Sequence, residues 1–88
     1  MRDELQQLPG IGPSKAADLK RLGVRSARDL ARRDPERLYV RLCEITGTRQ
    51  DPCVLYTFRC AVYAARTEKP KAELLKWWNW KGRTLARP

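Results

Sequence analysis

Two glycines, Gly10 and Gly12, mark the part of the sequence best suited to binding chemistry. They stand in the stretch LPGIGPSKAADL, directly before a segment that opens with Pro13. Proline is favoured at the start of a helix, and the first amide groups of a helix have no partner within it. We expect Gly10 and Gly12 to supply positive or otherwise restricted backbone angles in this tight turn. Glycine also leaves such amides open to an anion, and the helix dipole favours negative charge there. The pattern therefore predicts a phosphate-binding turn between two helices.

The groups predicted to contact phosphate are main-chain amides and their polar neighbours. The amides are those of Gly10, Gly12 and Lys15, with the Lys15 ammonium group close behind them. Ser14 belongs to the same first turn of the helix, whereas Pro13 has no N–H and supplies only rigidity. Contacts of this kind hold the sugar-phosphate chain and do not distinguish the bases. We therefore expect binding that is largely independent of sequence.

The composition favours a polyanionic partner. The 88 residues include 19 Lys and Arg against 10 Asp and Glu, which gives a net charge of +9. Nucleic acid is the commonest partner of so basic a chain, either DNA or RNA, although an acidic membrane surface or an acidic protein could use the same charge. No apolar run is long enough to cross a membrane and no secretion signal opens the sequence, so we expect a cytoplasmic protein.

The residue types that most hydrolytic and metal chemistry requires are missing. The sequence has no histidine, and its three cysteines, Cys43, Cys53 and Cys60, show no CxxC spacing. An odd number of cysteines argues against a disulfide framework, so we interpret them as reduced apolar residues of the core. No four-ligand zinc pattern is present.

The elements that must position the turn are all predicted to be helices, because alternating strand patterns are absent whereas helix start and stop signals recur. The expected helices cover about 3–8, 13–22, a short segment opening at Ser26, 35–45 and 52–65. The last of these is apolar nearly all round, which predicts a central, buried helix. The fold class is therefore all-α, a compact bundle of five to six short helices.

The predicted helix 35–45 has two faces. Its inward face carries aliphatic residues, Leu38, Leu42 and Ile45. Its outer side carries arginines that recur every four residues, Arg33, Arg37 and Arg41. Such a row is either a solvated face or a strip that contacts phosphates. We include Arg37 and Arg41 among the candidate nucleic-acid-binding residues.

The C-terminal segment is aromatic and basic. Residues 67–71 are predicted to be a connector, 72–82 a further helix packed on the bundle, and 83–88 a disordered tail. The aromatic and basic residues here are Trp77, Trp78, Trp80, Lys76, Lys81 and Arg83. Two interpretations stay open: a platform on which unpaired bases stack, or a clamp that packs two indoles against the bundle and leaves a third exposed.

The first turn resembles a known DNA-binding motif. The pattern Leu5-x-x-Leu8-x-Gly10-Ile11-Gly12-x-x-x-Ala16-x-x-Leu19 is similar, at every defining position, to the helix-hairpin-helix motif of DNA repair and replication proteins. The resemblance implies that the turn holds DNA phosphates through main-chain amides, often beside a monovalent cation, K+ or Na+. It also implies that the carbonyl groups of Gln6, Leu8 and Ile11 would hold this cation.

A second stretch resembles the same motif less closely. The aligned pairs are Leu5 with Leu42, Leu8 with Ile45, Gly10 with Gly47, Ala16 with Cys53 and Leu19 with Tyr56. Arg49 takes the place of the second glycine, where its side chain could reach a phosphate. We interpret 42–56 as a degenerate second hairpin that shares one domain, 1–66, with the first hairpin, 5–19; a coincidence of helical spacing is the alternative. In the family, paired hairpins grip both strands of a duplex.

Over nearly its whole length the sequence resembles the small bacterial proteins named for a pathogenicity locus, some of them labelled mitomycin-resistance-like. The stretches that carry this resemblance are LPGIGPSKAADLKRLGV, DPERLYVRLCEITGTRQDPCVLYTFRCAVYAA and LLKWWNWK. The function of that family is poorly defined. The leading hypothesis is therefore taken from the hairpin: a non-catalytic DNA-binding protein, connected with DNA repair or stress resistance.

Two other hypotheses stay open. One is a protein-interaction module that docks through the tryptophans, because tryptophan is enriched at interface hot spots. The other is an enzyme such as a base-excision glycosylase, a class that by resemblance uses an aspartate downstream of the hairpin. Asp29 and Asp34 stand downstream, but their neighbours indicate helix caps, and 88 residues leave no second domain to form a base pocket. We expect no catalytic residues and no enzymatic activity.

Overall fold

The computed structural model describes residues 4–85, and within this range it contains helices and turns without any strand. The α-helices are α1 (Pro13–Arg21), α2 (Ala27–Leu30), α3 (Pro35–Thr46) and α4 (Pro52–Arg66). The 3-10 helices are η1 (Glu4–Gln7), η2 (Ala72–Leu75) and η3 (Trp77–Trp80). The all-α class is confirmed. None of the described helices is long and apolar enough to cross a membrane.

Capping side chains and prolines explain where the α-helices begin. The side chains of Ser26, Asp34 and Asp51 accept hydrogen bonds from the amides of Asp29, Glu36 and Cys53, over 3.1, 3.0 and 2.8 Å. Each cap satisfies an amide that its helix leaves open. Three of these helices also have proline as their first residue, α1, α3 and α4. The helix starts predicted at 13, 35 and 52 are therefore confirmed.

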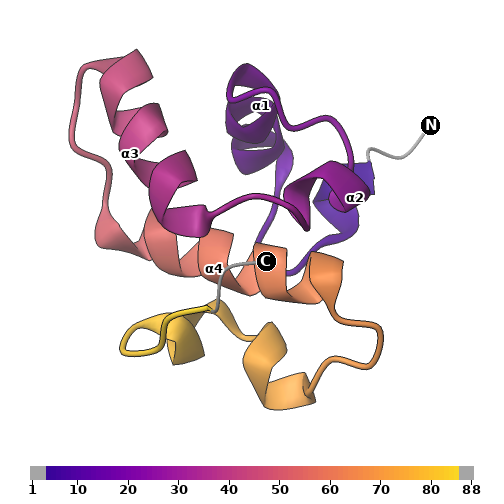
Figure 1. Cartoon of the computed structure of the whole chain (residues 1–88). Coiled ribbons are helices and arrows are strands. Elements are labelled where there is room, and N and C mark those ends of the chain that lie inside the picture. The colour runs from indigo at the N-terminus through magenta and orange to yellow at the C-terminus, as the bar shows by residue number, and fades with distance from the viewer. Residues whose placement is uncertain (1–3, 86–88) are drawn as a thin grey trace.

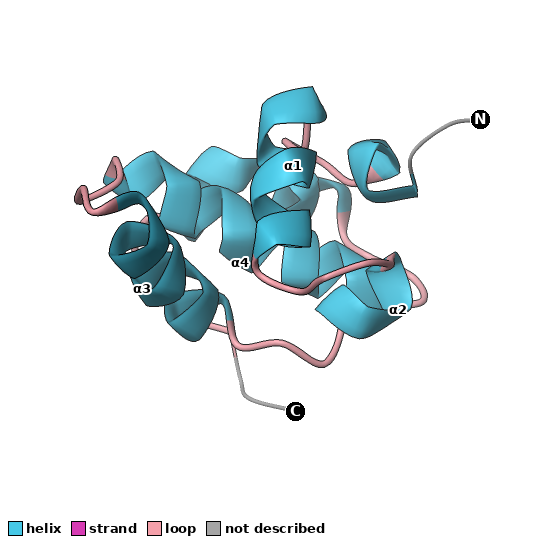
Figure 2. Ribbon diagram, turned by 90° about the horizontal axis from the view of Figure 1, so that it is seen from above, coloured by secondary structure: helices cyan, strands magenta, loops and turns pink. Residues whose placement is uncertain are grey.

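The central helix is α4, with α1, α2 and α3 on one side and the C-terminal 3-10 helices on the other (Figure 1, Figure 2). Its residues from 57 to 62 are all buried. Phe58 of α4 meets the core formed by Leu5, Leu19 and Leu30, and all four are fully buried. The predicted central position of this helix is confirmed.

A buried arginine fastens the C-terminal segment to this helix. The Nε group of Arg59 donates to Glu36 Oε1 of α3 over 2.6 Å, and its Nη1 group donates to the carbonyl of Trp80 over 3.0 Å. Charged hydrogen bonds of this kind are short and directional. Arg59 therefore ties α3, α4 and η3 together.

The predicted helix 72–82 is wrong in detail, because the segment forms two 3-10 helices that are separated by an extended residue, Lys76. Side chains of the second turn bond to carbonyls of the first: Trp80 Nε1 donates to Leu74 over 2.9 Å, and Asn79 Nδ2 to Glu73 over 2.6 Å. These bonds fold the chain back on itself and take the place of a helical ladder.

Three smaller expectations also need correction. Ile45 is 37% exposed rather than inward, because α3 rises away from α4 toward its C-terminal end (Figure 1). Cys53 is exposed, whereas Cys60 is buried and its burial raises the pKa of the thiol to about 11. Of the predicted disordered tail 83–88, residues 86–88 lie outside the described range, and Leu85 packs against the core.

Candidate nucleic-acid interface

The turn between η1 and α1 is built around Gly10. Its φ of +76° lies in the left-handed region, and a Cβ atom there would lie 2.9 Å from Thr57 Cγ2 of α4. Only glycine satisfies both constraints. Ile11 is 4% exposed and packs into the core, while its amide donates to the Leu8 carbonyl over 3.2 Å. The first predicted glycine is therefore required by the fold itself.

Gly12 plays a different part. Its φ of −90° and ψ of −172° describe extended backbone that any residue adopts, so the expectation of a restricted backbone angle here is wrong. Its two chain neighbours aside, no atom of residues 4–85 lies within 4 Å of the position that its Cβ would take. The absence of a side chain thus leaves an open surface directly before α1, rather than relieving a clash.

The start of α1 lacks the side-chain cap that α2, α3 and α4 possess. Within residues 4–85, the amides of Gly10, Gly12, Ser14 and Lys15 donate no hydrogen bond to the protein. No acidic residue stands in the first turn of α1, and Lys15 adds a positive charge to it. Unpaired amides, the helix dipole and one ammonium group make this corner favourable for an anion.

The carbonyl groups predicted to hold a monovalent cation belong to η1, in the case of Gln6, and to the turn that follows it, in the case of Leu8 and Ile11. The Leu8 carbonyl accepts the amide of Ile11 and retains a second lone pair. Main-chain oxygens of this kind suit K+ or Na+, and the described residues contain no group of three His, Cys, Asp or Glu side chains that could hold another metal. The cation at Gln6, Leu8 and Ile11 stays a prediction.

The turn between α3 and α4 is the region predicted as a second copy. Gly47 has a φ of +67°, close to that of Gly10. However, Pro52 follows Gly47 by five residues, whereas Pro13 follows Gly10 by three. Counted from the helix starts, Phe58 therefore takes the place of Leu19, and both are fully buried. The sequence alignment is displaced by two residues beyond the glycine, which explains why Cys53 is exposed where Ala16 is buried.

The start of α4 carries its own anion. The Asp51 carboxylate accepts the amide of Cys53 over 2.8 Å, and this hydrogen bond holds the pKa of the carboxyl below its ordinary value of 3.8. Asp51 is therefore ionised at neutral pH and would repel a phosphate from the amides that it caps. Arg49 is exposed in the same turn, so its side chain is the candidate contact there.

Arg37 and Arg41 do not lie at the first turn. They line a surface cavity of about 600 Å³ beside Leu22, just beyond the C-terminal end of α1. The cavity is also lined by Arg32 and Arg33, and we call these four residues the arginine cavity. The first turn precedes α1 and Leu22 follows it, so the whole of this nine-residue helix, about 13 Å long, stands between the turn and Leu22.

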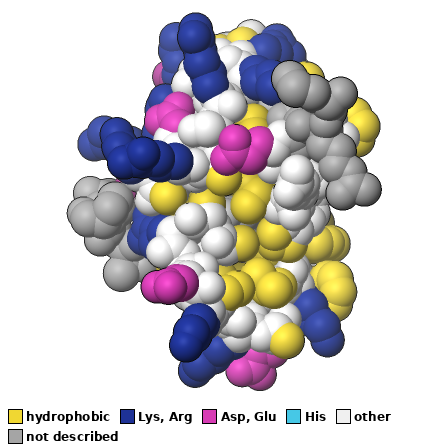
Figure 3. Space-filling view, turned by 90° about the vertical axis from the view of Figure 1, so that its right-hand side faces the viewer, with side chains coloured by type: hydrophobic (Ala, Val, Ile, Leu, Met, Phe, Trp, Pro, Cys, Tyr) yellow, Lys and Arg dark blue, Asp and Glu magenta, His cyan; other side chains and the backbone are white. Residues whose placement is uncertain are grey.

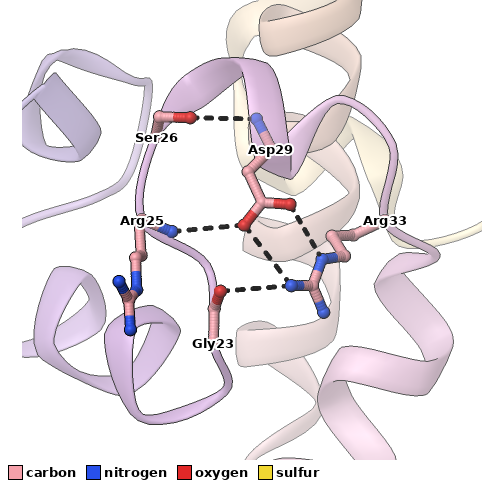
Figure 4. Close-up of polar contacts among 5 residues, drawn as sticks. All are labelled: Gly23, Arg25, Ser26, Asp29 and Arg33. Atoms are coloured by element: carbon pink, nitrogen blue, oxygen red, sulfur yellow. Dashed lines mark hydrogen bonds and ion pairs between the residues drawn. The ribbon is translucent and has the colours of Figure 1, made fainter.

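One wall of the arginine cavity is held in place by an ion pair (Figure 4). Arg33 donates from Nε to Asp29 Oδ1 over 3.3 Å and from Nη2 to the Gly23 carbonyl over 3.1 Å. The Arg33 side chain is the main reason that the pKa of Asp29 lies below its ordinary value. The sequence analysis missed Arg32 and this ion pair; Arg32 directly before Arg33, with Arg37 four residues further on, is the signal that could have indicated the cavity.

The tryptophans divide as the clamp interpretation predicts, with one indole left exposed. Trp80 is 2% exposed and belongs to the interior, whereas Trp78 is 56% exposed. Trp77 is half-buried, and its Cδ1 atom lies 3.7 Å from the position that a Cβ on Gly10 would take. The structure thus brings the aromatic segment against the inner side of the glycine turn.

A family model described as "Pathogenicity locus" matches residues 1–85. The chain belongs to the pathogenicity-locus family. One curated relative is the mitomycin resistance protein McrB of Streptomyces lavendulae, which is 34% identical to this pathogenicity-locus protein over 77 residues. These residues cover 88% of the chain and 70% of the relative. No solved structure matches. The family match includes the first turn, the arginine cavity and the aromatic segment of the pathogenicity-locus protein.

Proposed function

We propose that this pathogenicity-locus protein binds DNA without catalysis, and that its Gly10-Ile11-Gly12 turn acts as a helix-hairpin-helix phosphate grip. The observation that carries the proposal is the uncapped start of α1. In α2, α3 and α4 a side chain, that of Ser26, Asp34 or Asp51, accepts a hydrogen bond from an amide of the first turn. The start of α1 has no such side chain. A phosphate oxygen is the acceptor that such a corner fits best.

Each part of the turn has a separate task in this proposal. Gly10 fixes the turn against Thr57, and Gly12 keeps the approach free of side-chain atoms. The amides of Ser14 and Lys15 donate to a phosphate oxygen, and the Lys15 ammonium group adds attraction that needs no directed geometry. None of these groups contacts a base edge, so sequence preference should be weak.

Positively charged residues outside the turn would add further contacts with DNA phosphates. The net charge of +9 attracts a polyanion over the whole surface. The arginine cavity offers a second phosphate contact at the other end of α1, and Arg49 offers a third at the turn before α4. The curated relative is named for resistance to mitomycin. We include a role in DNA repair or stress resistance in the proposal on that basis.

The test is fluorescence anisotropy with a labelled DNA duplex over a series of salt concentrations. If about four phosphates are neutralised, the logarithm of the affinity should fall against the logarithm of salt with a slope near −3.6. Lys15→Ala should weaken binding more than Lys69→Ala, which removes the same charge from an exposed connector. Absence of duplex binding at low salt would end the proposal. An RNA duplex in the same assay decides between the two nucleic acids.

A protein-interaction module is the second candidate function. Trp78 is 56% exposed, and apolar side chains gather over the face in Figure 3, with lysine and arginine side chains around them. Exposed indoles and apolar areas of this kind are typical of docking surfaces. This candidate gains support if the protein binds neither DNA nor RNA in the salt series.

A further inference from the structure

We infer that Trp78 stacks on an unpaired base next to the phosphate held by the first turn, so that the protein prefers DNA with a single-stranded part over a fully paired duplex. The inference rests on the proposed function, because it needs a phosphate at the start of α1. It adds the structural class of the DNA, which the phosphate grip alone leaves undetermined.

Proximity is the first support. Trp77 lies against Gly10, with its Cδ1 atom 3.7 Å from the position of a Cβ there. Trp78 meets Trp77 edge to face, with ring centroids 5.8 Å apart and planes at 87°. One ring thus separates Trp78 from the turn, so a single strand that runs from a phosphate at the turn could reach the Trp78 ring within a few nucleotides. A base in a duplex is covered by its neighbours, so a base that stacks here must be unpaired.

Rigidity is the second support. The residues on either side of Trp78 are anchored, because the Trp80 ring is buried and its Nε1 group donates to the Leu74 carbonyl over 2.9 Å. The Trp80 carbonyl in turn accepts the Arg59 guanidinium over 3.0 Å. Because the backbone that carries Trp78 is fixed before binding, stacking of a base on the ring requires little ordering of the chain.

Charge is the third support, and it favours a nucleic acid over a protein partner. Trp78 stands between Lys76 and Lys81, both of them exposed, and Arg83 follows. Exposed aromatic rings among basic side chains are the arrangement with which proteins bind single strands, since each base has a face that can stack. An apolar protein surface would gain nothing from these charges.

The experiment compares two labelled DNAs at one salt concentration: a fully paired duplex, and the same duplex extended by unpaired thymidines at one end. The wild-type protein should bind the extended DNA more tightly by roughly 5- to 150-fold, the range of one base stack. The Trp78→Ala protein should bind the extended DNA only as tightly as the fully paired duplex. Its affinity for the fully paired duplex should equal that of the wild type. Trp78→Phe should retain part of the preference.

Val40→Ala is the matched control, because Val40 is also 56% exposed but lies on α3. It should change neither affinity. Quenching of indole fluorescence by an oligothymidylate gives a second readout, and it should be weaker in Trp78→Phe. A wild-type protein that binds both DNAs equally, or a Trp78→Ala protein that keeps the preference, would overturn the inference and leave the indole to a protein partner. If the wild-type protein does not bind the fully paired duplex at all, the proposed function fails, and this outcome is distinct from failure of the inference about Trp78.

Discussion

The two turns that follow η1 and α3 share a backbone plan but differ at the start of the next helix. Gly10 and Gly47 have φ values of +76° and +67°, and each turn leads to a helix with proline as its first residue. Before α1 the last turn residue is Gly12, with open space around it. Before α4 it is Asp51, whose carboxylate accepts the amide of Cys53.

The comparison shows that the residues that form such a turn differ from the residue that decides whether the turn can bind an anion. A left-handed glycine and a proline are sufficient to join two helices at a tight corner. Whether the corner can hold an external anion depends on the residue at the cap, because a carboxylate there satisfies the amides and repels phosphate. The first turn therefore leaves its amides without a side-chain cap, whereas in the second turn the Asp51 side chain supplies one.

The largest effect should come from Gly10→Ala compared with Gly47→Ala. Both alanines would have to adopt a left-handed backbone, but only at Gly10 does the new Cβ meet a neighbour, Thr57 Cγ2 at 2.9 Å. We expect Gly10→Ala to lower the free energy of unfolding by about 2–4 kcal/mol and Gly47→Ala by about 1–2 kcal/mol. Urea unfolding followed by circular dichroism measures both. Equal losses would show that the first turn is not packed as described.

A smaller effect is expected at the arginine cavity. Arg37→Ala should lower the affinity for duplex DNA. It should also reduce the slope of log affinity against log salt by about the amount that corresponds to one phosphate contact. Arg28→Ala is the matched control, because Arg28 is exposed and does not line the cavity. If both variants behave alike in the anisotropy assay, the cavity adds only general charge.

The smallest effect concerns pH and belongs to the second turn. The amide of Cys53 lowers the pKa of Asp51 below 3.8. A lowered pKa means that the cap stabilises the fold fully above that value and less as the pH falls through the pKa of the folded state. Asp51→Asn cannot titrate, so its stability should depend less on pH below about 4. Thermal unfolding at several acidic pH values tests this, and an unchanged pH dependence would contradict it.

Local signals predicted the helix starts well because a cap and a proline act within one turn of the chain. Ser26, Asp34 and Asp51 each bond to an amide two or three residues later, and Gly10 was found because a left-handed corner needs glycine. The first turn could therefore be predicted from the sequence almost completely.

The remaining features depend on contacts that are distant in the sequence. The arginine cavity forms because the end of α1 lies beside α3, and the aromatic segment folds back through bonds from Trp80 and Asn79 to earlier carbonyls. Helical periodicity contains no information about either arrangement.

The central claim is that open amides before α1 bind phosphate, and Gly12→Asp tests it most directly. The backbone at Gly12 is extended and its surroundings are empty, so an aspartate fits there and should cap α1 as Asp51 caps α4. We predict that the variant unfolds at the same or a slightly higher urea concentration but binds duplex DNA at low salt roughly tenfold or more weakly than the wild type. Gly12→Asn, a cap of the same shape without the charge, should lose less. A folded Gly12→Asp protein that binds duplex as tightly as the wild type would contradict the account.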